Sequence, residues 1–171
     1  MAVNEGVGPV EHPATDRLIY IVNRLARALN RAADDVAQRN GLSLSEFLLL
    51  LVLGEGPGLS NAQLARRTFV SSQAAHSVVT ELEARGMLSK APHETNRRVI
   101  LARITPQGRA VLDACLSEII KTESTLLDAL SPAERTNLLP ALLHSAETLA
   151  GGWFGDEAAE QAAAARRART N

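Results

Sequence analysis

Two arginines, Arg97 and Arg98, end a short polar segment whose composition is typical of a hairpin turn. The turn, residues 92–97, separates two runs that are predicted to be extended, residues 87–91 and 98–104, so Arg97 ends the turn and Arg98 lies directly beside it. A guanidinium group suits the phosphate backbone of DNA and the concentrated negative potential of a narrow minor groove. The alternative is that both arginines are simply solvated at a surface turn.

A second group of polar side chains lies on the helix predicted to follow Ser71. At 100° per residue, one side of this helix is apolar (Ala74, Ala75, Val78, Val79 and Leu82), and the other is small and polar (Gln73, His76, Ser77 and Thr80). Glutamine can pair with adenine, and the other three side chains can reach base edges or phosphates. Ser71 and Ser72, at the helix start, suit phosphate. Lys90, on the first extended run, completes the predicted DNA-binding set.

The distribution of charge agrees with this interpretation, although the net charge of the 171-residue chain is only −1. Residues 61–103 carry seven basic and three acidic side chains, a balance of +4, which leaves −5 for the rest of the chain. Such asymmetry can steer a polyanion to one face of a protein. The polar face of the helix after Ser71 is likewise unlike that of an ordinary surface helix, which would show more lysine and glutamate, and this favours a contact with DNA.

Other kinds of chemistry find little support in the sequence. There is no nucleophile elbow, phosphate loop or carboxylate pair, so we expect no catalytic residues and no enzyme. The four histidines have no ligand-like spacing, and we expect neither a metal nor a cofactor. The single cysteine, Cys115, lies among apolar residues and is predicted to be a buried structural thiol. No membrane span or signal peptide is evident, so a cytoplasmic protein is expected.

Helical periodicity and capping signals predict six helices around the polar turn. They cover about residues 16–39, 44–53, 61–67, 72–86 and 106–130, and a last stretch from residue 132. Their predicted caps are Thr15 or Asp16, Ser43, Ser60, Ser71, Thr105 and Ser131. The second helix is apolar nearly all round and should be buried. Pro140 should kink or split the last helix.

The order of these motifs resembles the MarR (multiple-antibiotic-resistance regulator) family of bacterial transcription factors. The matching segments are 62–65, 70–71, 82–88, 96–98 and 104–109. The resemblance implies a mainly α fold with a small β-wing, a winged helix-turn-helix with N- and C-terminal dimerisation helices. The wing of this family usually reads Asp-Arg-Arg, and Asn96 stands here in place of the acid. An amide can still form a hydrogen bond, but it cannot form the ion pair.

The expected organisation follows from the same resemblance and from the apolar stripes of the outer helices. It comprises a flexible arm (1–13), a helical dimerisation region (14–41 and 105–154), a winged domain (42–104) and a tail (155–171). Trp153 and Phe154 are expected to pack on the dimer partner or the first helix.

We expect a homodimer that binds double-stranded DNA at a pseudo-palindromic operator as a repressor. Many relatives release DNA when phenolic or aromatic acids bind, and Tyr20, Arg24 and Phe47 could form such a site. The alternatives are that these three residues are core or solvated, and that the winged dimer binds protein rather than DNA.

Overall fold

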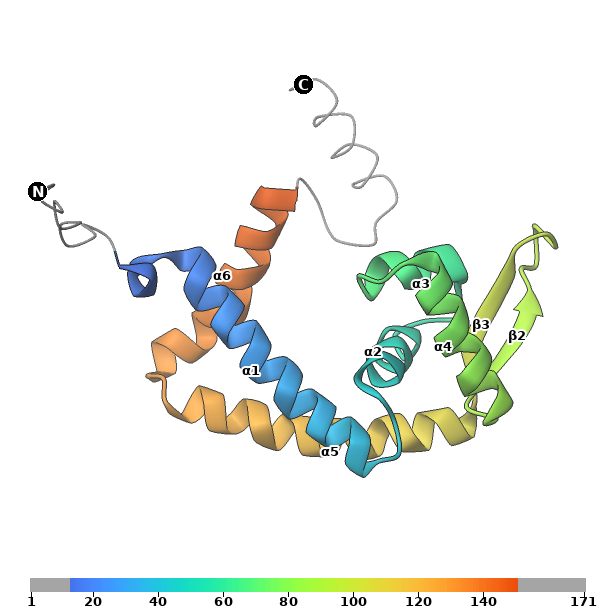
Figure 1. Ribbon diagram of the computed structural model, residues 1–171, viewed down its shortest axis with the longest axis horizontal. Helices are drawn as coiled ribbons and strands as arrows, with labels where there is room; N and C mark the ends of the chain where they lie inside the picture. Colours follow the sequence, from blue (N-terminus) through green and yellow to red (C-terminus); the bar gives the residue numbers. More distant parts are fainter. Residues whose placement is uncertain (1–12, 151–171) are drawn as a thin grey trace, which may run out of the picture.

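The chain folds into long helices that lead to a compact winged region at one end (Figure 1). The computed structural model describes residues 13–150. After a 3-10 turn (Ala14–Asp16), the elements are α1 (Leu18–Arg39), α2 (Leu44–Leu53), β1 (Leu59–Ser60), α3 (Asn61–Arg67), α4 (Ser72–Ala84), β2 (Leu88–Pro92), β3 (Ile100–Ile104), α5 (Pro106–Asp128) and α6 (Pro132–Ala150). This confirms a mainly helical winged fold. The expectations for the arm before residue 13, for Trp153 and Phe154, and for the tail concern residues outside the described range.

The wing is the outer part of a three-stranded antiparallel sheet in the order β1-β3-β2. The predicted ribbon of two strands is present as β2 and β3, and the third strand, β1, was not predicted. Leu59 pairs with Ala102 and Ser60 with Leu101, which adds β1 to the inner edge of β3. Two residues are too few to show the alternating pattern of a strand, so β1 was missed.

Most predicted helix starts are confirmed. Ser43 and Ser60 each form a complete capping box, with Glu46 and Gln63. The predicted cap of the first helix is wrong, because Thr15 and Asp16 belong to the 3-10 turn and Arg17 occupies the N-cap position without a side-chain bond. The last helix runs through Pro140 without being split.

The core lies where α2 meets α1, α3, α4 and α5. Leu49, Leu50 and Leu53 of α2 are at most 1% exposed. They share one cluster with Val36 of α1, Leu64 of α3, Leu82 of α4 and Leu112 of α5. Each such leucine contributes about 2 kcal/mol by leaving water. Cys115 also lies in this cluster, which confirms the prediction of a buried thiol. The pKa of this thiol is raised mainly by burial and to a smaller extent by the negative charge of Glu118.

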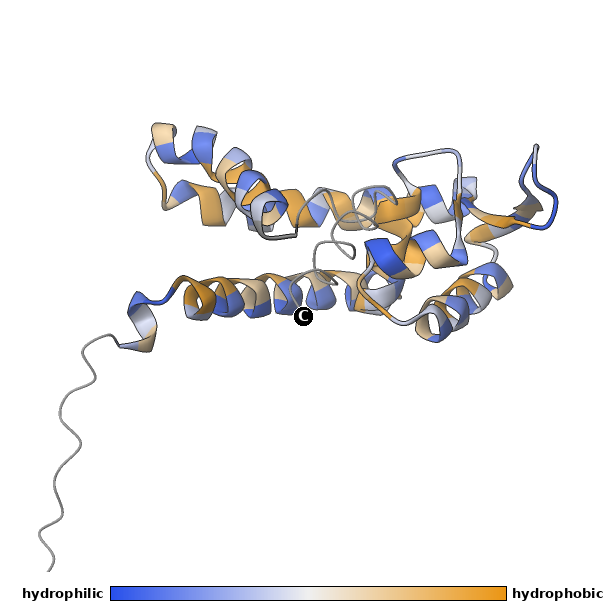
Figure 2. Cartoon of the chain, turned by 90° about the horizontal axis from the view of Figure 1, so that it is seen from above, coloured by the Kyte–Doolittle hydropathy of each residue, from blue (hydrophilic) through white to orange (hydrophobic). Residues whose placement is uncertain are grey.

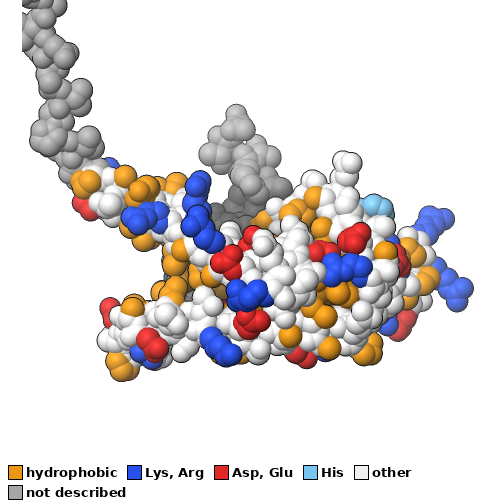
Figure 3. All heavy atoms as spheres, turned by 60° about the horizontal axis from the view of Figure 1, so that its bottom comes forward, with side chains coloured by type: hydrophobic (Ala, Val, Ile, Leu, Met, Phe, Trp, Pro, Cys, Tyr) orange, Lys and Arg blue, Asp and Glu red, His pale blue; other side chains and the backbone are white. Residues whose placement is uncertain are grey.

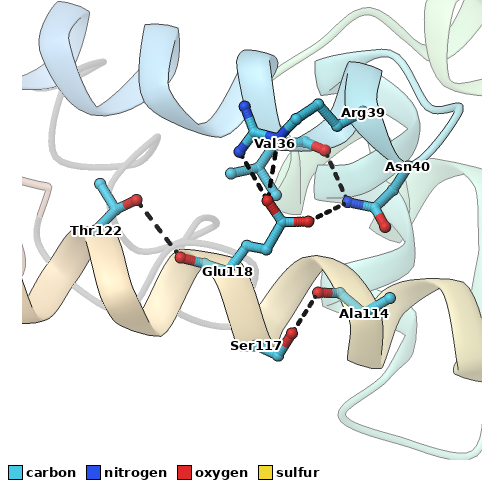
Figure 4. Close-up of polar contacts among 7 residues, drawn as sticks. All are labelled: Val36, Arg39, Asn40, Ala114, Ser117, Glu118 and Thr122. Carbon is cyan, nitrogen blue, oxygen red and sulfur yellow. Dashed lines mark hydrogen bonds and ion pairs between the residues drawn. The ribbon is translucent and has the colours of Figure 1, made fainter.

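A polar cluster holds the end of α1 against the middle of α5 (Figure 4). One carboxylate oxygen of Glu118 accepts hydrogen bonds from Nε and Nη2 of Arg39, at 3.1 and 2.7 Å. The other accepts from Nδ2 of Asn40 at 2.9 Å, and Nδ2 also donates to the carbonyl of Val36 at 2.9 Å. The hydrogen bond from Asn40 makes the largest contribution, and those from Arg39 the next largest, to lowering the pKa of Glu118. The junction of α1 and α5 is therefore well defined.

Much apolar surface on the long helices remains uncovered in the single chain. Leu18 and Ile19 on α1 are 74% exposed, Ile120 on α5 is 62% exposed, and Leu139 on α6 is 65% exposed. Figure 2, in which the ribbon is coloured by hydropathy, shows hydrophobic residues recurring along α1, α5 and α6. Such a surface is typical of an interface with another molecule.

No single helix in residues 13–150 is both long and apolar enough to cross a bilayer; α1 and α2 together pass on length and composition only, with a 90° bend between them.

Candidate nucleic-acid interface

Helix α4 has the two faces that the sequence predicted. Ala75, Val79 and Leu82 are buried against the core, and Gln73, His76, Ser77 and Thr80 are all exposed. Ala74 is a correction, because it is exposed although the projection placed it on the apolar side. The exposed face of α4 is thus uncharged near its N-terminus and rich in hydrogen-bonding groups.

The four polar side chains of this face differ in how many hydrogen bonds they can still make to a partner. The hydroxyl of Ser77 donates to the carbonyl of Gln73 at 3.1 Å, and that of Thr80 donates to the carbonyl of His76 at 2.9 Å. Both hydroxyls can therefore accept a further hydrogen bond but have used their proton. The side chains of Gln73 and His76 have no hydrogen-bond partner within residues 13–150. They are the better candidates for base recognition.

The start of α4 is capped and open. Ser71 Oγ accepts a hydrogen bond from the backbone amide of Ala74 at 3.1 Å, and both Ser71 and Ser72 are exposed. The first amides of a helix lack intrahelical partners and carry the positive end of its dipole. This end of α4 therefore suits a phosphate, and the contacts of Ser71 and Ser72 with DNA stay a prediction.

The wing tip is closed by backbone hydrogen bonds and by the side chains of His93 and Asn96, and His93 Nδ1 accepts from the amide of Thr95 at 3.2 Å. The amide of His93 donates to the carbonyl of Val99 at 2.8 Å, and the amide of Val99 donates to the carbonyl of Asn96 at 2.9 Å. Asn96 Oδ1 accepts from the amide of Arg98 at 3.3 Å. Asn96 therefore braces the turn by a hydrogen bond to the backbone, a role that the sequence only partly anticipated.

Arg97 and Arg98 are the exposed cations of this tip. Neither makes an ion pair or a side-chain hydrogen bond with another described residue. Figure 3 shows basic side chains at the right-hand end of the molecule, where the wing lies in Figure 1. Both side chains are thus available to an anionic partner.

The other basic residues of the positive segment are largely engaged within the chain. Arg67 pairs with Glu55, Arg85 with Glu46 at 2.8 Å, and Lys90 with Glu83 at 2.6 Å. Arg103 is partly buried, with its guanidinium stem against Gly58. A DNA contact by Lys90 stays a prediction and would have to share this lysine with Glu83. Arg103 makes no side-chain hydrogen bond or ion pair with another described residue, but it is partly buried, so among residues 13–150 the exposed and unpaired positive charge of the winged region is concentrated at Arg97 and Arg98.

Three hydrogen bonds fix α4 within the winged region and against α5. Asn61 Nδ2 donates to the carbonyl of Ser72 at 2.9 Å, at the start of α4. At its end, Thr105 Oγ1 donates to the carbonyl of Gly86 at 2.7 Å, and Gln107 Nε2 donates to that of Arg85 at 3.2 Å. The roles of the Asn61 and Gln107 side chains were not predictable from the sequence, because their partners are backbone groups of other elements.

The predicted ligand residues do not all meet. Tyr20 and Arg24 lie together on α1, with the guanidinium carbon 5.8 Å from the centre of the ring. They line a hollow with Ile19, Asn23 and Arg27. Phe47 is 3% exposed in the core and does not line this hollow. Within residues 13–150 there is also no group of three or more His, Cys, Asp or Glu that could hold a metal.

Comparisons with known proteins agree with this geometry. Residues 40–99 match the MarR family. The uncharacterised protein Rv2011c of Mycobacterium tuberculosis is 32% identical over 117 residues, which cover 68% of this chain and 81% of that protein. The chain belongs to the MarR family. The transcriptional repressor Rv2887 of the same species is 28% identical over 116 residues, 68% of this MarR chain and 84% of the repressor.

Solved structures show the same MarR fold. A MarR-family regulator from Silicibacter pomeroyi superimposes with a TM-score of 0.71 at 21% identity, over 80% of this chain and 92% of that one. Rv2887 in complex with DNA superimposes with a TM-score of 0.62 at 27% identity, over 74% and 94%. The protein is therefore a winged-helix DNA-binding transcriptional regulator, from a family of regulators rather than enzymes.

Proposed function

We propose that this regulator represses transcription as a homodimer bound to a pseudo-palindromic operator. The observation that carries the proposal is an uncharged polar face on α4 together with two exposed arginines at the wing tip that have no ion-pair partner among residues 13–150. In a winged helix-turn-helix protein, the second helix reads the major groove, and arginines of the wing suit the adjacent minor groove.

The exposed apolar surface supports the dimer. Leu18, Ile19, Ile120 and Leu139 lie on the helices that we assign to dimerisation, residues 14–41 and 105–154. Two-fold pairing would cover them and set the two α4 helices about 34 Å apart, one turn of DNA. The matching half-sites would then be related by the same two-fold axis.

Sedimentation of the full-length protein at micromolar concentration tests the dimer. The wild type should sediment as a dimer, and the double change Ile19→Asp with Leu139→Asp should yield folded monomers that bind operator weakly. Asn30→Asp is the control, since it adds a charge at an exposed position of the same helix. A monomeric wild type would contradict the proposal.

Repression itself is supported by the likeness to Rv2887, which is named a repressor. The test is a reporter gene whose promoter overlaps an operator selected from random duplexes by the purified protein. Expression of the wild type should lower the reporter signal, and the Arg97→Ala, Arg98→Ala variant should restore it. An increase in the reporter signal with the wild type would identify an activator instead.

We further propose that a small aromatic or phenolic acid binds near Tyr20 and Arg24 and releases the DNA. A ring could stack on Tyr20 while its carboxylate pairs with Arg24, and the hollow on α1 has both groups beside each other. The likeness to Rv2887, whose structure has been solved with salicylic acid and with p-aminosalicylic acid, supports this class of ligand. Release requires that the acid bind the free dimer more tightly than the DNA-bound dimer.

Titration of salicylate into the protein–operator complex tests the effector. The wild type should release DNA, and Tyr20→Ala and Arg24→Ala should each need more salicylate for the same release. Equal responses of wild type and both variants would place the sensor elsewhere, and no release would exclude salicylate as an effector.

A further inference from the structure

Arg85, the first residue after α4, joins this helix to the turn between α1 and α2. Its Nη1 donates to Glu46 Oε1 at 2.8 Å, and its Nη2 donates to the carbonyl of Gly41 at 2.6 Å. Glu46 lies in the first turn of α2, and Gly41 follows the end of α1. One side chain thus fixes the end of α4 both to α2, within the winged region, and to the turn that follows α1, a helix of the proposed dimerisation region.

Glu46 is well suited to act as a rigid anchor. It is only 7% exposed, and its second oxygen accepts from the amide of Ser43 at 2.7 Å. Each charge of the pair also lies at the favourable end of its own helix, the carboxylate at the N-terminus of α2 and the guanidinium at the C-terminus of α4. A planar guanidinium held by two acceptors allows little rotation.

The contacts of Arg85 lie at one end of α4, and the polar face of α4 that is proposed to contact bases (the reading face) begins near the other end. Gln73 lies 12 positions before Arg85 on the helical stretch, which corresponds to about 18 Å. A tilt of about 10° at Arg85 would therefore displace Gln73 by about 3 Å, close to one base-pair step of about 3.4 Å. A small change at the Arg85 end is enough to move the reading face out of register with a half-site.

We propose that Glu46 and Arg85 are positioning residues that set the angle between the recognition helix and the dimer scaffold. Through this angle they determine which spacing between two half-sites the protein accepts. The proposal rests on the dimer and the paired half-sites proposed above. It predicts a defect in spacing discrimination, which differs from a general loss of affinity.

The test uses full-length protein and the operator selected by the wild type. Two further duplexes carry one base pair inserted or removed between the half-sites, which shifts one half-site by about 3.4 Å and about 35°. Affinities for the three duplexes are measured for the wild type, Arg85→Lys and Glu46→Gln. Lysine loses the two-armed contact, and glutamine has one oxygen for two donors. Glu83→Gln is the control, because Glu83 lies on α4 but pairs with Lys90 of the wing.

The wild type should strongly prefer the selected spacing. Arg85→Lys and Glu46→Gln should each reduce that preference by about tenfold or more, and Glu83→Gln should keep it. Circular dichroism and sedimentation identify variants that are folded and dimeric. If only one of Arg85→Lys and Glu46→Gln is folded and dimeric, that variant is sufficient for the comparison with the wild type. If both lose affinity equally for all three duplexes, the pair serves stability alone and the proposal is wrong. A wild type indifferent to spacing would refute the paired half-sites, and the positioning role with them.

Discussion

Replacing Arg97 and Arg98 by alanine should weaken DNA binding and should also make the affinity for DNA less dependent on salt concentration. Both guanidinium groups are exposed and lack partners among residues 13–150, so no internal ion pair is lost with them. In the proposed dimer the change removes four positive charges. If each neutralises one phosphate, the slope of log K against log salt should become flatter by about 3.6, at about 0.9 per phosphate. Between 50 and 200 mM salt, the wild type should lose about 150-fold more affinity than the variant.

Fluorescence anisotropy with an operator duplex and a random duplex measures this difference over a series of KCl concentrations. Both duplexes should show the same flattening, because contacts to the backbone and the minor groove at the wing carry little sequence information. The control is Arg17→Ala with Arg31→Ala, which removes two exposed arginines, one at the N-cap position of α1 and one within α1. If the wing variant keeps the wild-type slope, or the control flattens it equally, the assignment of these arginines to DNA is refuted.

Three further predictions concern single side chains. Gln73→Ala should cost about 1–3 kcal/mol at one base position and relax the preference there, as measured by selection from random duplexes, whereas equal losses on all sequences would argue against base contact. Glu118→Gln should lower the melting temperature at neutral pH, because hydrogen bonds from Asn40 and Arg39 lower the pKa of Glu118 in the folded state. The folded state then holds its proton less tightly than the unfolded state, so this stabilisation is present above the ordinary glutamate pKa. It should vanish as pH falls through the lowered value, and a wild-type advantage that persists in acid would contradict this cause. Cys115 should react with a thiol reagent only after unfolding, since it is fully buried and its pKa is raised, and rapid labelling of the native protein would show otherwise.

The elements of this fold could largely be read from local sequence signals. Ser43 and Ser60 start their helices with side-chain bonds to residues three positions on, an interaction that is entirely local. The periodicity of α4 likewise predicted which side chains are exposed, with the exception of Ala74, because an amphipathic helix buries its apolar side in almost any compact fold. The short strand β1 escaped prediction because its pairing with Ala102 joins residues 43 positions apart in the chain.

The candidate site divides in the same way. Its residue types and their order along the chain, including Gln73 and the arginines of the wing, were evident from the sequence alone. Which charges are free was decided by the tertiary structure, since Arg85 and Lys90 find carboxylates while Arg97 and Arg98 find none among the described residues. The fold likewise buried Phe47 and left Tyr20 and Arg24 together on the surface. Electrostatic and packing contacts depend on distances between elements remote in sequence, and composition and periodicity carry no information about those distances.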